Sequence, residues 1–315
     1  MILKSFFTAF FAALFIAAIL VIRGNNPVTT TIASPLPDYL VNTPLVQGLD
    51  FWKPKSTNVL QSVITKPQVS AKAAFVYDIS TDTVLYDKNG KERLPVASLV
   101  KVMTAIVALE SKSPITLVRV SPNAASTGEN RMGISAGERY TLEELLYGLV
   151  LHSGNDAAVA IAESVAVTQQ DFTNLMNQKA KILGLTDTHF ANPSGLEDEE
   201  QGAQEYSTAY DLAIITKHAL TLPTFAKVAA TVEYEIPYSE DHKYLYFFNQ
   251  TNLLTSYPGV KGVKTGYTPA AGLCLITYSE NGGHKLIGVV LNSESRREEM
   301  KVLLSYSFAL FGITP

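Results

Sequence analysis

Residues 98–101 read SLVK, residues 153–155 read SGN and residues 264–266 read KTG. Each motif is common when it occurs alone. In this order along one chain, the three motifs are typical of a single acyl-transfer site built around a nucleophilic serine. Chemistry of this kind uses no metal and no other cofactor, so we expect neither.

The first motif places a serine and a lysine three residues apart. At the start of a helix, Ser98 and Lys101 point to the same face. A serine hydroxyl is a poor nucleophile until a base removes its proton, and Lys101 acts as that base only when it is neutral. Burial beside a second cation such as Lys264 lowers the pKa of Lys101. The alternative for this motif alone is an N-cap serine followed by a solvated helical lysine.

The second and third motifs supply polar groups on either side of a cleft. Ser153 lies at a break between an apolar run and a helix, where its hydroxyl can relay a proton while the Asn155 amide holds a carbonyl. Lys264 and Thr265 side by side suit a carboxylate, and Gly266 lets a substrate backbone approach closely. Each motif alone also fits ordinary turn, cap or edge-strand residues. Their joint occurrence favours an active site.

The composition indicates a globular protein with a sizeable core. The chain has 315 residues, of which 47% are hydrophobic and 17% are charged, and its net charge is -4. Lys and Arg are scattered, so we expect no nucleic-acid partner. The single cysteine, Cys274, allows no internal disulfide and lies in an apolar run, which favours a buried strand residue over a nucleophile.

The N-terminal segment, residues 1–23, differs sharply from the rest of the chain. Residues 5–22 carry no charge and are close to the length that spans a bilayer. We expect an uncleaved membrane anchor, and a cleaved signal peptide is the alternative. Residues 24–70 are rich in Pro, Thr, Ser and Asn, as a linker is. We therefore expect an exported catalytic domain over residues 71–315.

The hydrophobic pattern predicts an α/β (α+β) fold. Strands at both ends of the domain enclose a mainly helical middle third, which favours one antiparallel sheet, flanked by terminal helices, with an inserted helical lobe. The cleft is expected between sheet and lobe. The predicted strands are 73–78, 83–87, 232–237, 244–248, 273–279 and 286–292. Four helices are predicted at residues 99–110, 157–165, 171–183 and 295–311. A further helix is predicted to begin with a capping box at residues 141–144.

Around these motifs the chain resembles the low-molecular-weight penicillin-binding proteins, specifically the D-alanyl-D-alanine carboxypeptidases. The resemblance covers about residues 73–311 and implies the serine β-lactamase/penicillin-binding-protein-like transpeptidase fold. Members of this family often continue into a second, β-rich domain with a C-terminal membrane helix. Here the N-terminal segment is expected to anchor the protein to the membrane instead. The similar segments are 95–104 (PVASLVKVMT), 151–158 (LHSGNDAA), 192–196 (NPSGL), 206–212 (YSTAYDL), 262–268 (GVKTGYT) and 271–272 (AG).

The resemblance implies a role for each catalytic residue. Ser98 attacks the carbonyl between the last two D-alanines of a peptidoglycan stem peptide, with Lys101 as the general base. Ser153 passes the proton to the departing D-alanine, and Asn155 positions the substrate. Water then hydrolyses the acyl-enzyme. Penicillins and other β-lactams, which mimic this substrate, are expected to leave Ser98 acylated.

The resemblance also implies a substrate-binding set. Lys264, Thr265 and Gly266 face the terminal carboxylate, and the backbone N–H groups of Ser98 and Tyr267 form the oxyanion hole. Arg296 is a candidate for supporting the carboxylate pocket, and Arg297 competes for the same place. The alternative is that these arginines form only a solvated helix start. The implied location is the extracytoplasmic face of the cytoplasmic membrane in a bacterial cell envelope.

Three other activities remain compatible with the fold. An endopeptidase that cuts peptidoglycan cross-links breaks the same D-alanyl bond with the same residues. A serine β-lactamase needs a glutamate that activates the deacylating water. Here the acidic residues 197–200 follow NPSGL and not an E-x-x-L-N segment. A non-catalytic penicillin-binding sensor would have lost Ser98, Lys101 or Lys264, and all three are present.

Overall fold

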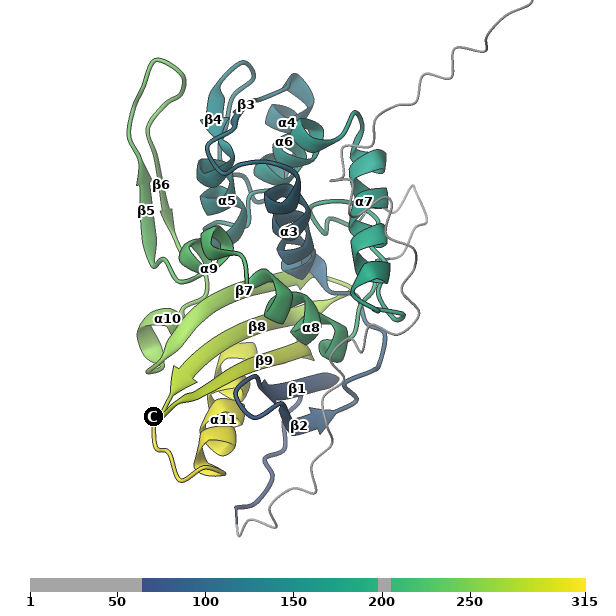
Figure 1. Cartoon of the computed structure of the whole chain (residues 1–315), viewed down its shortest axis with the longest axis vertical. Coiled ribbons are helices and arrows are strands. Elements are labelled where there is room, and N and C mark those ends of the chain that lie inside the picture. The colour runs from purple at the N-terminus through teal and green to yellow at the C-terminus, as the bar shows by residue number, and fades with distance from the viewer. Residues whose placement is uncertain (1–63, 198–204) are drawn as a thin grey trace, which may run out of the picture. The chain divides into compact units, whose positions relative to one another are not determined.

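A five-stranded antiparallel sheet in the order β2-β1-β9-β8-β7 forms the centre of the domain (Figure 1). The structure is a computed structural model that describes residues 64–197 and 205–315. The predicted anchor, residues 1–23, and the linker as far as residue 63 lie outside the described residues. The strands are β1 (Ala73–Asp78), β2 (Thr83–Lys88), β7 (Val260–Thr268), β8 (Gly272–Asn281) and β9 (His284–Ser293).

The sheet joins the two ends of the domain. The predicted hairpin of β1 and β2 is confirmed, and so is the β8–β9 hairpin, whose turn residues Gly282 and Gly283 both have positive φ. β1 also pairs with β9, so that Ala73 lies opposite Leu291. β7, which carries the KTG motif, is left at the edge of the sheet.

Helices cover both faces of the sheet; the predicted terminal helix covers one face, and a helix from the middle of the chain covers the other. α11 (Arg296–Ala309) packs on one face, where Met300, Leu303 and Leu304 are fully buried against β9 and β8. α8 (Ala209–Ala219) packs on the other face (Figure 1). Because both faces are covered, the strands are apolar on both sides, and all six residues of β1 are buried.

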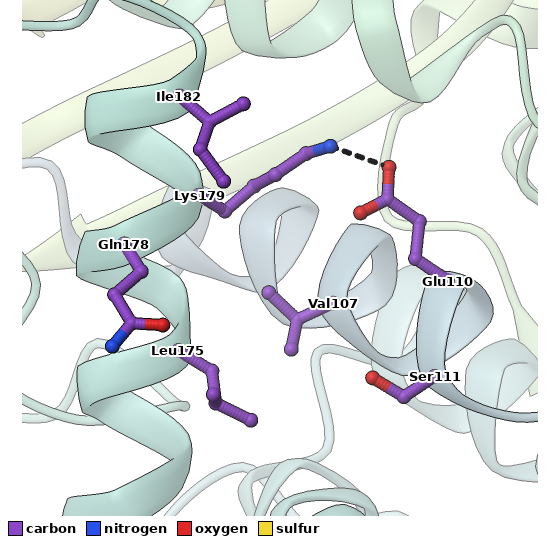
Figure 2. A pocket seen from close by; sticks show the side chains of 7 residues that line it. All are labelled: Val107, Glu110, Ser111, Leu175, Gln178, Lys179 and Ile182. Atoms are coloured by element: carbon purple, nitrogen blue, oxygen red, sulfur yellow. Dashed lines mark hydrogen bonds and ion pairs between the residues drawn. The ribbon is translucent and has the colours of Figure 1, made fainter. Parts of the chain in front are cut away.

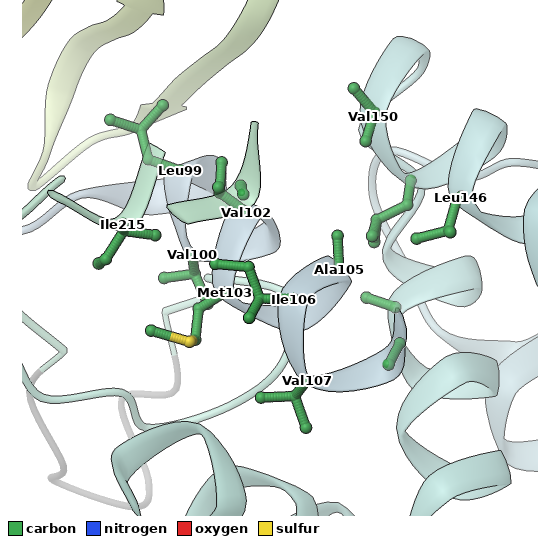
Figure 3. Close-up of a cluster of buried hydrophobic side chains, with 14 of the residues drawn as sticks. Leu99, Val100, Val102, Met103, Ala105, Ile106, Val107, Leu146, Val150 and Ile215 are labelled. Atoms are coloured by element: carbon green, nitrogen blue, oxygen red, sulfur yellow. The ribbon is translucent and has the colours of Figure 1, made fainter. Parts of the chain in front are cut away.

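The helical lobe lies between β2 and β7 in the sequence. At its centre α3 (Lys101–Ser111) is buried over most of its surface, as expected for a helix that is apolar all round (Figure 3). The predicted capping box is present, with Thr141 and Glu144 each bonding the backbone of the other at the start of α5. The remaining elements are η1 (Ala97–Val100), β3 (Leu117–Arg119), α4 (Pro122–Ser126), β4 (Arg139–Thr141), α5 (Leu142–Leu151), α6 (Asn155–Val165), α7 (Gln169–Ile182), α9 (Pro223–Ala229) and α10 (Leu253–Ser256).

Two of the predicted strands do not join the main sheet, contrary to the expectation of a single sheet, and β3 and β4 also pair apart from it. β5 (Glu233–Ile236) and β6 (Leu245–Phe248) pair only with each other among the described strands and contact α5. Phe247 is buried beneath this hairpin, whereas its neighbour Phe248 is half exposed. The helical lobe therefore covers one apolar face of the hairpin, and the other face stays exposed.

A buried ion-pair cluster ties the lobe together (Figure 2). Glu110 near the end of α3 lies 2.6 Å from Lys179 Nζ of α7 and 2.7 Å from His218 Nε2 of α8. The adjoining cavity has a volume of about 10 Å³, which accommodates at most one water molecule. This cavity is a structural feature of the lobe and not a ligand site.

The segment just before the first strand rests on the domain. Lys88 Nζ donates to the carbonyl oxygen of Val69, and Tyr86 Oη donates to that of Pro67. The described end of the predicted linker thus already contacts the sheet. Within residues 64–197 and 205–315, no helix is long and apolar enough to span a membrane.

Candidate active site

The serine and the lysine of the first motif lie side by side. Ser98 lies in the 3-10 turn η1, and Lys101 is the first residue of α3. Lys101 Nζ lies 2.9 Å from Ser98 Oγ, within hydrogen-bond distance. The N-cap of α3 is Val100, so Ser98 does not cap this helix.

Lys101 is fully enclosed by protein. Its Nζ also donates to Asn155 Oδ1 at 2.8 Å and to the carbonyl oxygen of Ser194 at 2.5 Å. Burial lowers the pKa of Lys101 to about 7, although the carboxylates of Glu205, Glu129 and Asp156 act in the opposite direction. A substantial fraction of Lys101 is therefore neutral near pH 7, as a general base requires.

The second motif lies directly beside this pair. Ser153 has a φ of 63°, in the left-handed region, and its buried Oγ has no hydrogen-bond partner in the part of the chain that the structure describes. Asn155 is the first residue of α6 and reaches Lys101. The next residue, Asp156, accepts backbone N–H bonds from Met132 at 2.6 Å and Gly133 at 2.8 Å, and so ties a neighbouring loop to the motif. Strain and an unpaired hydroxyl at Ser153 are typical of a functional position.

The third motif places a second buried cation at the site. Lys264 is 1% exposed, and its Nζ donates to the carbonyl oxygen of Thr265 at 3.1 Å. Burial, followed by repulsion from Lys101 and Arg296, lowers the pKa of Lys264 well below its ordinary value. Across the described residues no carboxylate lies within ion-pair distance of Lys264. A bound anion would restore its charge.

Two glycines allow the segments of the site to pack closely. A Cβ on Gly266 would lie 3.0 Å from the carbonyl oxygen of Val96, so β7 fits against the turn that carries Ser98. Gly195 has a φ of +77°, and a Cβ there would lie 2.2 Å from the carbonyl oxygen of Ala97. Tyr267 follows on β7 with its side chain 62% exposed. The three motifs are thus brought together as predicted.

Comparison with known proteins agrees with this geometry. The model of the D-alanyl-D-alanine carboxypeptidase family, peptidase S11, matches residues 60–295. The chain belongs to this family. The D-alanyl-D-alanine carboxypeptidase DacF of Bacillus subtilis is 38% identical over 253 residues, which cover 78% of this chain and 64% of that protein. The chain thus spans slightly less than two thirds of this relative.

Two further relatives extend the comparison. The D-alanyl-D-alanine carboxypeptidase DacB2 of Mycobacterium tuberculosis is 36% identical over 222 residues, which cover 70% of this chain and 74% of that protein. The crystal structure of the Streptomyces K15 DD-transpeptidase superposes with a TM-score of 0.73 at 31% identity, covering 78% of this chain and 100% of that one. The predicted penicillin-binding-protein-like α/β fold is confirmed.

Sequence reasoning missed two contributors to the candidate active site of this carboxypeptidase family member. The carbonyl of Ser194 is the shortest contact of Lys101 Nζ, and a backbone group carries no residue-type signal. The Glu205 carboxyl group interacts with Lys101 and accepts a hydrogen bond from the backbone of Ala191, and burial raises its pKa well above the ordinary value. The only sequence signal for either residue was its place in or beside the NPSGL and YSTAYDL segments.

The structure distinguishes the two arginines that are candidates for supporting the carboxylate pocket of this carboxypeptidase family member. Arg296 Nη1 donates to the carbonyl oxygen of Gly266 at 2.6 Å, directly behind the KTG motif, whereas Arg297 is exposed. Cys274 is fully buried in β8, and burial raises its pKa to about 11. The prediction that this cysteine is a buried strand residue is confirmed.

Proposed function

We propose that this protein is a serine D-alanyl-D-alanine carboxypeptidase that removes the terminal D-alanine from peptidoglycan stem pentapeptides. The observation that carries the proposal is the contact between a fully buried Lys101 and Ser98 Oγ at 2.9 Å. Membership of the carboxypeptidase family supports the substrate class. No cofactor enters the reaction.

Acylation begins when Ser98 Oγ attacks the carbonyl carbon of the penultimate D-alanine and Lys101 Nζ takes the serine proton. The resulting oxyanion accepts hydrogen bonds from the backbone N–H groups of Ser98 and Tyr267. The C–N bond then breaks, and the departing amine receives a proton through Ser153. Asn155 fixes both Lys101 and the substrate during this step.

Deacylation repeats the sequence with water as the nucleophile. Lys101 takes a proton from the water, the bond between the acyl group and Ser98 breaks, and the serine recovers its proton. During acylation, the free carboxylate of the terminal D-alanine lies against Lys264 and Thr265, with Arg296 behind them. The open edge of β7 provides backbone groups along which an extended peptide can lie as an added strand.

Two properties follow from the same site. β-Lactams react with Ser98 in the same way as the substrate and remain attached. The substrate lies outside the cytoplasm, so we place the enzyme at the extracytoplasmic face of the cytoplasmic membrane, held by residues 1–23, or secreted if that segment is cleaved.

The test is release of D-alanine from a stem pentapeptide by the full chain in mild detergent, beside its Ser98→Ala variant. We expect release by the wild type and none by the variant. Intact-protein mass after penicillin treatment should show one adduct that maps to Ser98. Release that survives in the variant, or an adduct elsewhere, would overturn the nucleophile assignment.

A further inference from the structure

A buried carboxyl group, that of Glu205, lies close to the nucleophile turn and takes no part in acylation. It belongs to a short extended segment in which Ser207 and Leu94 exchange both backbone hydrogen bonds, at 2.9 and 3.1 Å. Because this pairing is antiparallel, Glu205 comes level with Val96, two residues before Ser98. The backbone pairing therefore brings a carboxyl group to the edge of the catalytic centre.

The same carboxyl group supports the turn that contacts the base. Glu205 accepts a hydrogen bond from the backbone N–H of Ala191, directly before the NPSGL segment. Within that segment, the carbonyl oxygen of Ser194 lies 2.5 Å from Lys101 Nζ. Gly195 of the same segment packs against the nucleophile turn, where it has no room for a Cβ. The position of Glu205 is thus fixed relative to both catalytic side chains.

One oxygen of the Glu205 carboxyl group has no partner. Its Oε2 is buried and makes no hydrogen bond within residues 64–197 and 205–315. A buried carboxyl oxygen of this kind is costly, and a water molecule commonly satisfies it. Of the carboxylates that act on Lys101, Glu205 has the largest effect on the pKa of the lysine. The unpartnered oxygen therefore belongs to a group that interacts directly with the charge of the base.

Deacylation makes two demands on the site. The attacking water must lose a proton, and the oxygen of Ser98 must gain one as it leaves the acyl group. Lys101 Nζ lies 2.9 Å from Ser98 Oγ, so it is placed to protonate the leaving oxygen. A second group that accepts the proton of the water allows both transfers to occur in one step.

The other carboxylates that act on Lys101 are poorly suited to this second task. Asp156 already accepts backbone N–H bonds from Met132 and Gly133, at 2.6 and 2.8 Å. Glu129 is an exposed residue, so bulk water surrounds it. Glu205 alone among the three carboxylates combines burial with an oxygen that has no partner in the described part of the chain.

We infer that Glu205 is the base of deacylation, which holds the attacking water and takes its proton. This inference rests on the proposed function, because it concerns the acyl-enzyme that Ser98 forms. With one proton on Lys101, the Glu205 carboxylate removes a proton from the water, and the water oxygen bonds to the acyl carbon. The bond from that carbon to Ser98 Oγ breaks, and Oγ receives the proton of Lys101. Lys101 then regains a proton from Glu205, so the proton of the water reaches the lysine through this carboxyl group.

Acylation uses the other arrangement of the same proton. When the proton lies on Glu205, Lys101 is neutral and can accept the proton of Ser98. Burial favours this arrangement, because it raises the pKa of Glu205 well above its ordinary value and lowers that of Lys101. The substitution of Glu205 should therefore affect deacylation far more than acylation.

The test measures the two half-reactions separately in the full chain in mild detergent. Intact-protein mass reports the rate at which penicillin acylates Ser98, and rapid quenching reports acyl-enzyme formed from a stem pentapeptide. We expect Glu205→Gln to react with penicillin within about threefold of the wild-type rate and to lose about 10²-fold in kcat with the pentapeptide. The glutamine keeps the size of the side chain and the acceptor for Ala191, but it cannot take a proton. The variant should release about one equivalent of D-alanine in a burst and accumulate the tetrapeptide adduct.

Two further variants serve as controls. Glu197, the exposed acidic residue after NPSGL, accepts a hydrogen bond from the backbone of Ala270 at 3.2 Å. Glu197→Gln should keep the wild-type kcat and show no burst. Glu205→Asp keeps a carboxylate and should recover part of the kcat that Glu205→Gln loses.

The possible outcomes distinguish the inference from the proposed function. Wild-type kcat in Glu205→Gln, or a low kcat without accumulated acyl-enzyme, would overturn the inference. Slower acylation of this variant by penicillin, to the same extent as the loss of kcat, would show a purely structural role for Glu205 and would also overturn it. Failure of the wild-type enzyme to release D-alanine would instead overturn the proposed function.

Discussion

Lys101 Nζ and Ser98 Oγ lie 2.9 Å apart, and the lysine of this pair has no exposed surface. The two facts act together. In the proposed mechanism the contact gives the serine a proton acceptor, and the burial leaves a substantial fraction of that acceptor neutral near pH 7, where an exposed lysine is almost fully charged. Because the same Nζ also contacts Asn155 and Ser194, its position is fixed by three groups.

The first prediction concerns the pH dependence of acylation. The pKa of Lys101 is lowered to about 7, so the neutral base becomes more abundant as the pH rises through that value. We expect kcat/KM for D-alanine release to rise through an apparent pKa near 7. Lys101→Arg, which stays charged, should lower kcat/KM by about 10²- to 10⁴-fold at every pH in the range. A flat profile between pH 5 and 9 would contradict Lys101 as the base.

The second prediction concerns Gly195, whose place against the nucleophile turn leaves no room for a side chain. Gly195→Ala adds a Cβ at 2.2 Å from the carbonyl oxygen of Ala97 and also strains a backbone at φ +77°. We expect a loss of about 2 to 4 kcal/mol in the free energy of unfolding, measured in urea. We also expect a fall in kcat, because Ser98 adjoins the displaced carbonyl.

A matched control exists for Gly195. Gly283 in the β8–β9 turn has a φ of +85°, and a Cβ there would meet nothing within 4 Å. Gly283→Ala therefore introduces backbone strain alone and should cost about 1 kcal/mol, with kcat unchanged. Equal effects of the two substitutions on stability and kcat would show that crowding at Ala97 is unimportant.

The third prediction concerns Glu110, which pairs with Lys179 in Figure 2 and also with His218. Burial opposes its charge, but hydrogen bonds from His218 and Lys179 outweigh burial and lower the pKa of Glu110 below its ordinary value of 4.5. Glu110→Gln should lower the free energy of unfolding at pH 7 by about 3 kcal/mol, because it leaves a buried lysine without its counter-charge.

The pH dependence of this effect has a definite sign. A carboxyl group whose pKa is lower in the folded state than in the unfolded state stabilises the folded protein at pH values above its ordinary pKa. This stabilisation is lost as the pH falls through the folded-state pKa. The difference between wild type and Glu110→Gln should therefore shrink below about pH 4. Glu143, which forms an exposed pair with Lys227, provides the control, and Glu143→Gln should change stability by no more than about 1 kcal/mol. If both substitutions changed the free energy of unfolding at pH 7 by a similar amount, burial of the Glu110 ion pair would not explain its contribution.

Local patterns in the sequence predicted most of the fold. The capping box at Thr141 and Glu144, the two hairpins and the terminal helix depend on neighbouring residues, and all of them form. The partnership of β5 with β6 alone was not predictable in this way. Strand periodicity shows that a strand has an apolar face, but it does not show whether a sheet or the helix α5 will cover that face.

The same distinction applies to the site. Motif order predicted Ser98, Lys101 and Lys264, because their side-chain chemistry is visible in the sequence. The carbonyl of Ser194 and the buried carboxyl group of Glu205 act through positions that only the folded chain defines. Their contributions depend on contacts between distant segments, and neither periodicity nor residue type reports such contacts.

The pairing of β1 with β9 has a consequence for how the chain reaches its native state. Ala73 cannot meet Leu291 until nearly the whole domain has been synthesised. Contacts between residues so far apart in sequence carry a large loop-closure entropy and slow the folding reaction. Until β9 arrives, β1 presents an unpaired apolar edge to other chains. Aggregation during refolding should therefore compete most strongly with this single closing step.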